Sequence, residues 1–219
     1  MLVEKGGEDA FFVSSYNGGI IAVADGVSGW AEQDVDPSLF PKELMAHVSC
    51  LVGDEEVNNN PQILIGKAHA ATSSTGSATV IVAMLERNGI LKIANVGDCG
   101  LKVIREGKIN FSTSPQEHYF DCPYQLSSEA VSQTYLDAMI MMIAGDYDCG
   151  IIRLQFQVSS IELMEGDTIV TGSDGLFDNV FDHEIVSTLA RYRNVAEAGG
   201  KPDDITVIVG QSLITFIDP

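Results

Sequence analysis

Short apolar runs separated by turn residues dominate the hydrophobic pattern of the chain. Residues 10–14 and 20–24 form two such runs, and Asn17-Gly18 between them readily adopts the positive φ angles of a tight hairpin. In an antiparallel pair, the start of the first strand lies beside the end of the second. The pattern therefore predicts a hairpin whose open end carries Glu8, Asp9 and Asp25.

The rest of the chain continues this strand-rich pattern. Four further runs predict an antiparallel meander, another pair predicts a second hairpin, and a β-branched run closes the pattern. These segments are, in order, residues 78–85, 90–96, 100–104 and 108–111, then 160–163 with 168–171, then 205–209. The strands outnumber the helices and show no βαβ alternation, which indicates an α+β fold.

Three segments have helical spacing instead. Residues 37–52 place Leu44 and Val48 on one face, residues 61–71 begin at a proline, and residues 182–191 turn Ile185 inward. The chain has 219 residues, 45% of them hydrophobic, and no Pro- or Ser-rich linker divides it. A single domain over residues 1–219 is therefore expected.

Acidic corners mark the ends of several predicted strands. Asp25-Gly26 and Asp174-Gly175 each follow an apolar run, and Asp203-Asp204 opens another. One Asp-Gly pair alone is more often a simple turn. Several carboxylates brought together from separate strands repel one another unless cations neutralise them, so their joint occurrence favours a divided metal site.

The charge of the chain limits its partners. Twelve Lys and Arg against 31 Asp and Glu give a net charge of −19, which argues against nucleic acid or an anionic membrane as a partner. The four cysteines form no Cys-x-x-Cys pair. The longest apolar stretch, residues 138–144, is too short to span a bilayer, and the first residues lack a signal-peptide core. The chain is expected not to be membrane-embedded and to carry no targeting peptide.

Five ordered motifs resemble those of type-2C metal-dependent serine/threonine protein phosphatases. They are Gly7-Glu8-Asp9-Ala10, Ala24-Asp25-Gly26-Val27, Val96-Gly97-Asp98, Ser173-Asp174-Gly175-Leu176-Phe177-Asp178 and Asp203-Asp204-Ile205-Thr206-Val207. The resemblance covers nearly the whole chain. It implies an α-β-β-α sandwich of two antiparallel sheets flanked by helices.

The resemblance also implies a chemistry. Two Mn²⁺ or Mg²⁺ ions, with a third at a weaker position, would activate a water that attacks phosphoserine or phosphothreonine directly. Asp25 would bridge two ions, and Asp25 and Asp9 are the expected catalytic residues. The expected metal ligands are Asp25, Gly26 through its carbonyl, Asp174, Asp203, Glu8, and at the third position Asp98 and Asp178. For Asp98, a turn role is nearly as well supported.

Three departures from the family bear on this site. Lys5 stands where the family has a phosphate-binding arginine, and it is expected to contact substrate unless it is a solvated terminal residue. Val27 replaces a common histidine, which leaves His118 or metal-held water as the proton donor. The segment between Asp178 and Asp203 is short, and the family's first strand is not evident before Glu8.

A further motif narrows the resemblance. His118-Tyr119-Phe120-Asp121-Cys122-Pro123-Tyr124-Gln125-Leu126 is similar to the mitochondrial and plastid subgroup, and most similar to plant photosystem II core phosphatases. That similarity implies phosphoprotein substrates, thylakoid photosystem II core subunits among them, and the chloroplast stroma, with the mitochondrial matrix or cytoplasm as alternatives. A noncatalytic regulatory module that keeps the fold is the alternative function. A two-metal phosphodiesterase is a third hypothesis, but the chain lacks a basic track for nucleic acid.

Overall fold

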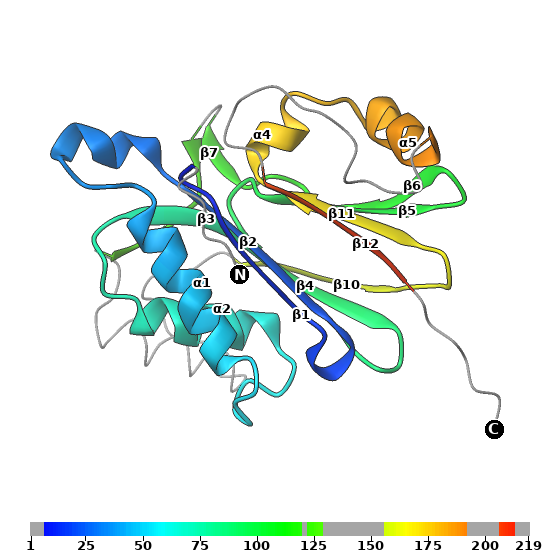
Figure 1. Cartoon of the computed structure of the whole chain (residues 1–219), viewed down its shortest axis with the longest axis horizontal. Coiled ribbons are helices and arrows are strands. Elements are labelled where there is room, and N and C mark those ends of the chain that lie inside the picture. The colour runs from blue at the N-terminus through cyan, green and yellow to red at the C-terminus, as the bar shows by residue number, and fades with distance from the viewer. Residues whose placement is uncertain (1–6, 120–121, 129–155, 192–205, 213–219) are drawn as a thin grey trace.

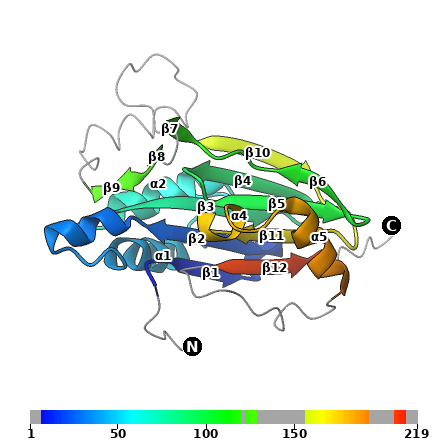
Figure 2. The same ribbon diagram turned by 90° about the horizontal axis from the view of Figure 1, so that it is seen from above.

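The computed structural model describes residues 7–119, 122–128, 156–191 and 206–212, arranged in four layers (Figure 1). Two antiparallel sheets face each other, with helices α1 and α2 on one side and α4 and α5 on the other. Seen from above, the strands of both sheets run along the same direction of the molecule (Figure 2). The predicted α-β-β-α sandwich is confirmed.

Six of the described strands form the larger sheet, in the order β1-β2-β3-β4-β10, with β9 paired to β3. Their bounds are β1 Ala10–Ser14, β2 Ile20–Gly26, β3 Ser77–Leu85, β4 Ile90–Val96, β9 Leu126–Ser127 and β10 Gln157–Glu162. The predicted first hairpin is confirmed: β1 pairs with β2, and Ala10 lies opposite Ala24. Its turn is the 3-10 helix η1, Tyr16–Gly18, in which Asn17 has a φ of 50°. This register places Asp9 across from Asp25.

The smaller sheet has four described strands in the order β12-β11-β5-β6. Their bounds are β5 Gly100–Arg105, β6 Lys108–Ser112, β11 Thr168–Gly172 and β12 Val207–Gln211. Strands β7 (Glu117–Tyr119) and β8 (Cys122–Pro123) form a separate two-stranded ribbon.

Two predicted pairings were wrong, and both errors concern which sheet a strand joins. The expected meander divides after β4, because β3 and β4 belong to the larger sheet and β5 and β6 to the smaller. The expected second hairpin does not form, since β10 pairs with β4 and β11 pairs with β5 and β12. A short connection between two strands is compatible with a hairpin or with a step from one layer to the other, so their spacing does not distinguish the two.

A buried ion pair holds the step from β10 to β11. The Arg105 guanidinium donates to the Asp167 carboxylate through Nε at 2.8 Å and Nη2 at 2.6 Å, and Asp167 is 1% exposed. Nη2 also donates to the Glu162 carbonyl at 3.0 Å, at the end of β10. Arg105, on β5, therefore fastens the connection to the smaller sheet.

Three described helices follow the predicted segments closely: α1 Leu39–Leu51, α2 Pro61–Ala71 and α5 Asp182–Arg191. The 3-10 helix η2, Ser28–Gln33, and the short helix α4, Asp174–Phe177, were not predicted. The Asn60 side chain caps α2 by accepting from the amides of Gln62 and Ile63 at 2.9 and 3.3 Å. No helix within the described ranges is long and apolar enough to cross a membrane.

Three apolar clusters fill the spaces between the layers. One lies under α1 and α2 around Phe40, Leu44 and Leu64; a second lies between the sheets around Ile81 and Ile93. The third, smaller cluster joins Val170 and Ile104 to α4 and α5. The sheets are therefore buried on both faces, and the strand ends are left for polar residues.

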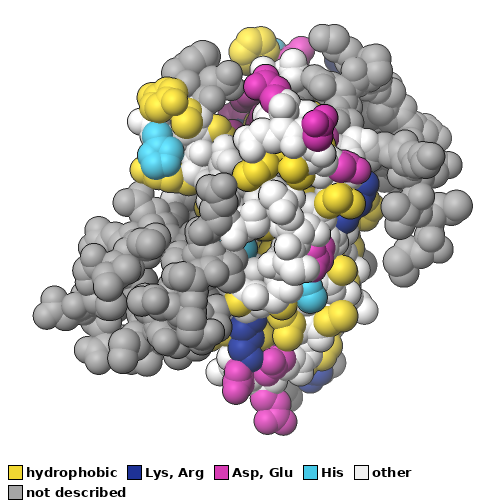
Figure 3. Space-filling model, turned by 90° about the vertical axis from the view of Figure 1, so that its left-hand side faces the viewer, with side chains coloured by type: hydrophobic (Ala, Val, Ile, Leu, Met, Phe, Trp, Pro, Cys, Tyr) yellow, Lys and Arg dark blue, Asp and Glu magenta, His cyan; other side chains and the backbone are white. Residues whose placement is uncertain are grey.

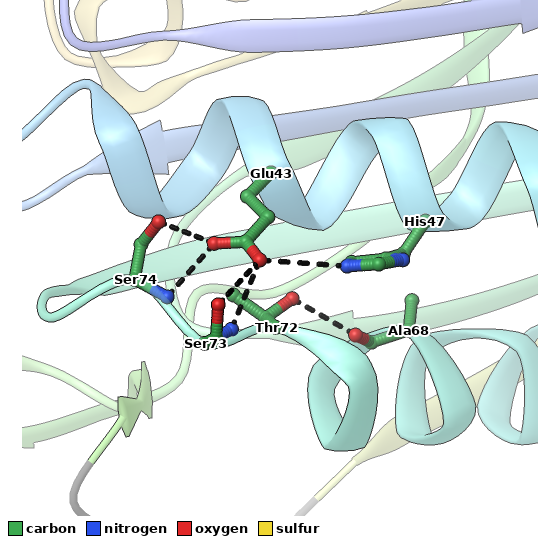
Figure 4. Close-up of polar contacts among 6 residues, drawn as sticks. All are labelled: Glu43, His47, Ala68, Thr72, Ser73 and Ser74. Atoms are coloured by element: carbon green, nitrogen blue, oxygen red, sulfur yellow. Dashed lines mark hydrogen bonds and ion pairs between the residues drawn. The ribbon is translucent and has the colours of Figure 1, made fainter.

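Glu43 on α1 holds the loop that leads from α2 into β3 (Figure 4). Its carboxylate accepts from the backbone amide of Ser73 at 3.1 Å and that of Ser74 at 2.8 Å, and from both serine hydroxyls. His47 Nε2 lies 3.6 Å from the same carboxylate, one turn along α1. These hydrogen bonds, with that of the Ser74 hydroxyl as the largest cause, lower the pKa of Glu43 to about 2.

Candidate active site

Strands β2 and β11 end at one edge of the sandwich, where a cavity of about 620 Å³ opens. Among the described residues, five carboxylates line it: Glu8, Asp25, Asp98, Asp174 and Asp178. Figure 3 shows the face at the left-hand side of Figure 1, where acidic side chains lie over the upper half and again at the lower edge. The acidic corners that were separate in the sequence therefore share one site.

The carboxyl group of Asp25 has a strongly raised pKa. This residue occupies β2 directly before Gly26, opposite Thr79 of β3. Its pKa is raised to about 10, first by burial and then by the charges of Asp9 and Asp174, which also lie within hydrogen-bond reach of Asp25. A site with this much negative charge favours either a proton or a bound cation.

A hydroxyl network holds Asp9 in place. Ser173, just after β11, donates from its hydroxyl to Asp9 Oδ2 at 2.9 Å. The Ser173 hydroxyl oxygen in turn accepts from the Thr206 amide at 3.3 Å, and the Ser173 amide donates to the Thr206 carbonyl at 3.2 Å. Asp9 is thus tied to β11 and to the segment that enters β12, which connects the two sheets at the site.

Gly26 has no room for a side chain. A Cβ there would lie 2.5 Å from the Pro37 carbonyl oxygen and 2.8 Å from that of Glu8. Both obstacles are backbone atoms, so even alanine would force the chain apart. The glycine thus allows the segment that carries Glu8 to approach the end of β2.

Asp98 lies beside the central group, in the turn between β4 and β5. Its pKa is raised to about 6, first by burial and then by the nearby Asp174 charge, with a hydrogen bond to the Thr79 hydroxyl opposing the rise. Asp178, at the end of α4, contributes a further negative charge. Asp98 and Asp178 therefore form a second acidic group next to Asp25 and Asp174.

The position of helix α4 is set by the Phe177 ring, which packs closely on Gly100 of β5. A Cβ on Gly100 would lie 2.5 Å from the Phe177 ring, and Lys102 Nζ sits 5.4 Å from its centroid while pairing with Asp182 at 2.7 Å. An adjoining cavity of about 510 Å³ lies over this ring and shares Asp98 and Asp178 with the first. The position of Asp174 thus depends on Phe177 packing closely on β5.

The donor set fits a hard divalent cation. The described residues around the larger cavity offer carboxylate, amide, hydroxyl and carbonyl oxygens, and no Lys, Arg or His among them lines it. Mg²⁺ and Mn²⁺ prefer such oxygens, and their charge would relieve the repulsion around Asp25. In the described ranges no three Asp, Glu, His or Cys side chains form a ready-made ligand cluster, and Asp203 lies outside those ranges.

Comparison with known proteins decides the family. The chain is 66% identical over 196 residues to "Probable protein phosphatase 2C 26" of Arabidopsis thaliana, covering 90% of this chain and 60% of that protein. It is 32% identical over 255 residues to "Protein phosphatase PTC7 homolog fig" of Drosophila grimshawi, covering 94% and 80%. The chain belongs to the protein phosphatase 2C family.

A solved phosphatase 2C structure shows the same fold at high identity. The X-ray structure of the photosystem II phosphatase PBCP matches with a TM-score of 0.75 and 62% identity, over 87% of this chain and 68% of that one. No protein-family model matches the chain. The chain spans about three fifths of the length of its Arabidopsis relative.

Most of the predicted site residues of this phosphatase 2C chain come together in the structure. Glu8, Asp25, Gly26, Asp98, Asp174 and Asp178 line the cavity, and Asp9 contacts Asp25. Lys5 and Asp203 lie outside the described residues, as does most of the methionine-rich segment 139–157. The roles assigned to all these residues stay predictions.

His118 is exposed on β7 and does not line the cavity; its ring contacts that of Tyr124, edge to face, at 4.0 Å between centroids. This arrangement favours the structural interpretation of His118 over a role as proton donor.

The sequence pattern did not identify several residues that line the cavity, Thr79 and Gln125 among them. Thr79 is a polar residue within the apolar run of β3, and this interruption was an available signal. Gln125 reaches the cavity because β9, which follows it directly, pairs with β3. The local sequence pattern does not predict this pairing.

Proposed function

We propose that this chain is a metal-dependent protein phosphatase that hydrolyses phosphoserine and phosphothreonine. The observation that carries the proposal is the acidic cavity, where strand ends converge on Asp25, Asp174 and Asp9. Membership of the phosphatase 2C family supports the reaction class, and the oxygen-only donor set supports Mn²⁺ or Mg²⁺ as cofactor.

Each acidic residue of the cavity has a proposed role in binding metal or orienting water. Asp25, Asp174, Asp203 and the Gly26 carbonyl would hold two ions, and Asp98 with Asp178 a third. Bound there, two such ions would supply positive charge for the phosphoryl oxygens and would lower the pKa of a water poised for in-line attack on phosphorus. Glu8 and Asp9 would orient that water by accepting its protons. No covalent phosphoenzyme is needed, because the water displaces the alkoxide directly.

The whole of residues 1–219 is proposed to act as a single phosphatase domain. Its substrates are phosphoproteins, and the similarity to the photosystem II phosphatase PBCP supports photosystem II core subunits and the chloroplast stroma. A regulatory module without activity is the second candidate. The retention of Asp25 and Asp174 at the cavity disfavours it.

Phosphate release from a phosphothreonine peptide tests this proposal. Release should require Mn²⁺ or Mg²⁺, stop on chelation, and fall at least about 100-fold in Asp25→Asn, the order expected when a main charge-stabilising group is lost. Asp34→Asn makes the same charge change on an exposed residue and should keep full activity. A folded, metal-binding chain that releases no phosphate would point to the regulatory module.

Substrate identity needs a second assay. Phosphorylated thylakoid core subunits should be hydrolysed faster than unrelated phosphoproteins at equal concentration. Equal or reversed rates would reject the photosystem assignment and leave the reaction class standing.

A further inference from the structure

A relay of hydrogen bonds runs from the loop after Asp25 to the far wall of the cavity. Trp30 Nε1, in η2, lies 2.7 Å from Ser77 Oγ, at the start of β3. Ser77 Oγ lies 2.8 Å from Gln125 Oε1. Gln125 belongs to the sequence motif at residues 118–126, to which the proposed chemistry assigns no role.

The chemistry of the donors fixes the direction of this relay. An indole N–H can only donate, so Ser77 Oγ accepts from Trp30. The single hydroxyl proton of Ser77 is donated to Gln125, whose carbonyl oxygen, Oε1, is the atom that lies at 2.8 Å. The amide nitrogen of Gln125 therefore faces away from Ser77.

The backbone on both sides of Gln125 is pinned. Leu126 and Ser127 pair with Ala78 and Ser77 in the ladder between β9 and β3. On the other side, the Tyr124 amide donates to the Gln116 carbonyl at 3.0 Å. A side chain held at its base and at its oxygen presents Nε2 in one direction with little conformational freedom.

That direction matters because of what the cavity contains. Gln125 lines the same cavity as Asp25 and Asp174, whose carboxylates can only accept hydrogen bonds when ionised. No hydrogen bond to Gln125 Nε2 is present among the described residues, whereas Asn179, the other amide side chain in this lining, donates to the Gly175 carbonyl at 2.9 Å. Gln125 thus adds two N–H donors to a cavity that is lined by several carboxylates.

We propose that Gln125 is a substrate-binding residue whose Nε2 donates to a non-bridging oxygen of the phosphoryl group. Ser77 and Trp30 are positioning residues that hold the amide in this orientation. The inference rests on the proposed phosphatase function and adds to it a neutral phosphate donor. Phosphoryl oxygens accept without donating, so they match the exposed N–H groups.

Two substitutions separate the donor from the shape of the side chain. Gln125→Met removes the polar group at similar volume. Gln125→Glu keeps an oxygen for Ser77 and replaces the donor by an anion, so it tests the donor without disturbing the relay. Gln62→Met, on α2 away from the cavity, is the matched control.

The first readout is steady-state kinetics on a phosphothreonine peptide and on para-nitrophenyl phosphate. Gln125→Met should raise KM about 10-fold for both substrates with kcat nearly unchanged, because the contact is made in the bound state and the transition state alike. Gln125→Glu should raise KM further. Ser77→Ala should raise KM less, and should add nothing in the Gln125→Met background, because it acts through Gln125.

The second readout is calorimetric binding of inorganic phosphate in saturating Mg²⁺, which needs no turnover. Affinity should fall about 10-fold in Gln125→Met, while Mg²⁺ affinity and thermal stability stay within the range of Gln62→Met.

Each alternative outcome has a distinct meaning. A KM change confined to the peptide would place the contact on the peptide and overturn the phosphoryl assignment. Unchanged KM and unchanged phosphate affinity in both Gln125 variants would overturn the proposal outright. A wild-type chain without turnover would refute the phosphatase function instead, and phosphate calorimetry alone would then decide whether Gln125 binds the anion.

Discussion

Replacing Asp25 by Asn should stabilise the metal-free protein. Asp25 is half-buried beside Asp9 and Asp174, and its pKa is raised to about 10 from an ordinary value of 3.8. Asn keeps the size and hydrogen-bonding capacity of the protonated carboxyl but needs no proton to remain neutral. The substitution therefore removes a repulsion that the folded, metal-free chain must otherwise relieve by binding a proton.

The magnitude follows from the pKa difference. At pH 7 the folded chain keeps a proton on Asp25 and the unfolded chain does not, so each pH unit above 3.8 lowers the unfolding free energy of wild type by about 1.4 kcal/mol. The upper limit is about 4 kcal/mol. Asp9 and Asp174 share the repulsion and the cavity admits solvent, so we expect about 2 kcal/mol, or about 4–8 °C in Tm.

The pH dependence has a definite sign. A folded-state pKa above the unfolded value gives stability that is complete below about pH 4 and is lost as pH rises toward 10. Asn does not titrate. The advantage of Asp25→Asn should thus be near zero at pH 4 and grow through pH 8.

Urea denaturation in a chelator, at pH 5, 6, 7 and 8, measures this advantage. Asp34→Asn is the control, since Asp34 is exposed and its φ of 58° suits Asn equally well. Excess Mg²⁺ should reverse the order, because a ligand at 100 times its Kd adds about 2.7 kcal/mol to the form that binds it. An Asp25→Asn chain that is less stable than wild type in chelator, or an advantage that does not vary with pH, would refute the reasoning.

Two further predictions concern the supports of the site. Glu43→Gln should lower the unfolding free energy by about 1 kcal/mol at pH 7, a value reduced for solvent screening. Because the depressed pKa of Glu43 makes wild type lose stability between pH 5 and 2, the variant should lose less stability over that range. Acid denaturation that follows the same curve in both proteins would contradict this. Gly100→Ala should displace the Phe177 ring, lower the unfolding free energy by about 1–3 kcal/mol and weaken Mg²⁺ binding, and Phe177→Leu in the same chain should restore part of both. Urea denaturation measures the first effect and calorimetry the second. A Gly100→Ala chain with wild-type values would show that the ring moves at no cost.

Local elements of the fold were predictable because their causes are local. Asn17 adopts the positive φ of the first turn, and Pro61 is the first residue of α2, as predicted from the sequence. The hairpin register then brings Asp9 opposite Asp25, so part of the acidic cluster also followed from the sequence.

The allocation of strands to sheets was not predictable in this way. Strand β3 is buried over nearly its whole length, on both faces, so its pattern carries no information on which neighbour or layer it meets. The step from β10 to β11 depends on Arg105 reaching Asp167, two residues 62 positions apart. Alternation of side chains describes one strand and leaves its partners undetermined.

The local structures and the acidic corners can be read from the chain alone, because turn chemistry, helix caps and strand ends depend on neighbouring residues. The surroundings of those corners depend on the packed fold, which places Ser173 beside Asp9, Phe177 against Gly100, and Gln125 in hydrogen-bond contact with Ser77 and, through it, Trp30. Orientation of a side chain depends on partners contributed by distant segments. Those contacts exist only after the two sheets have packed together.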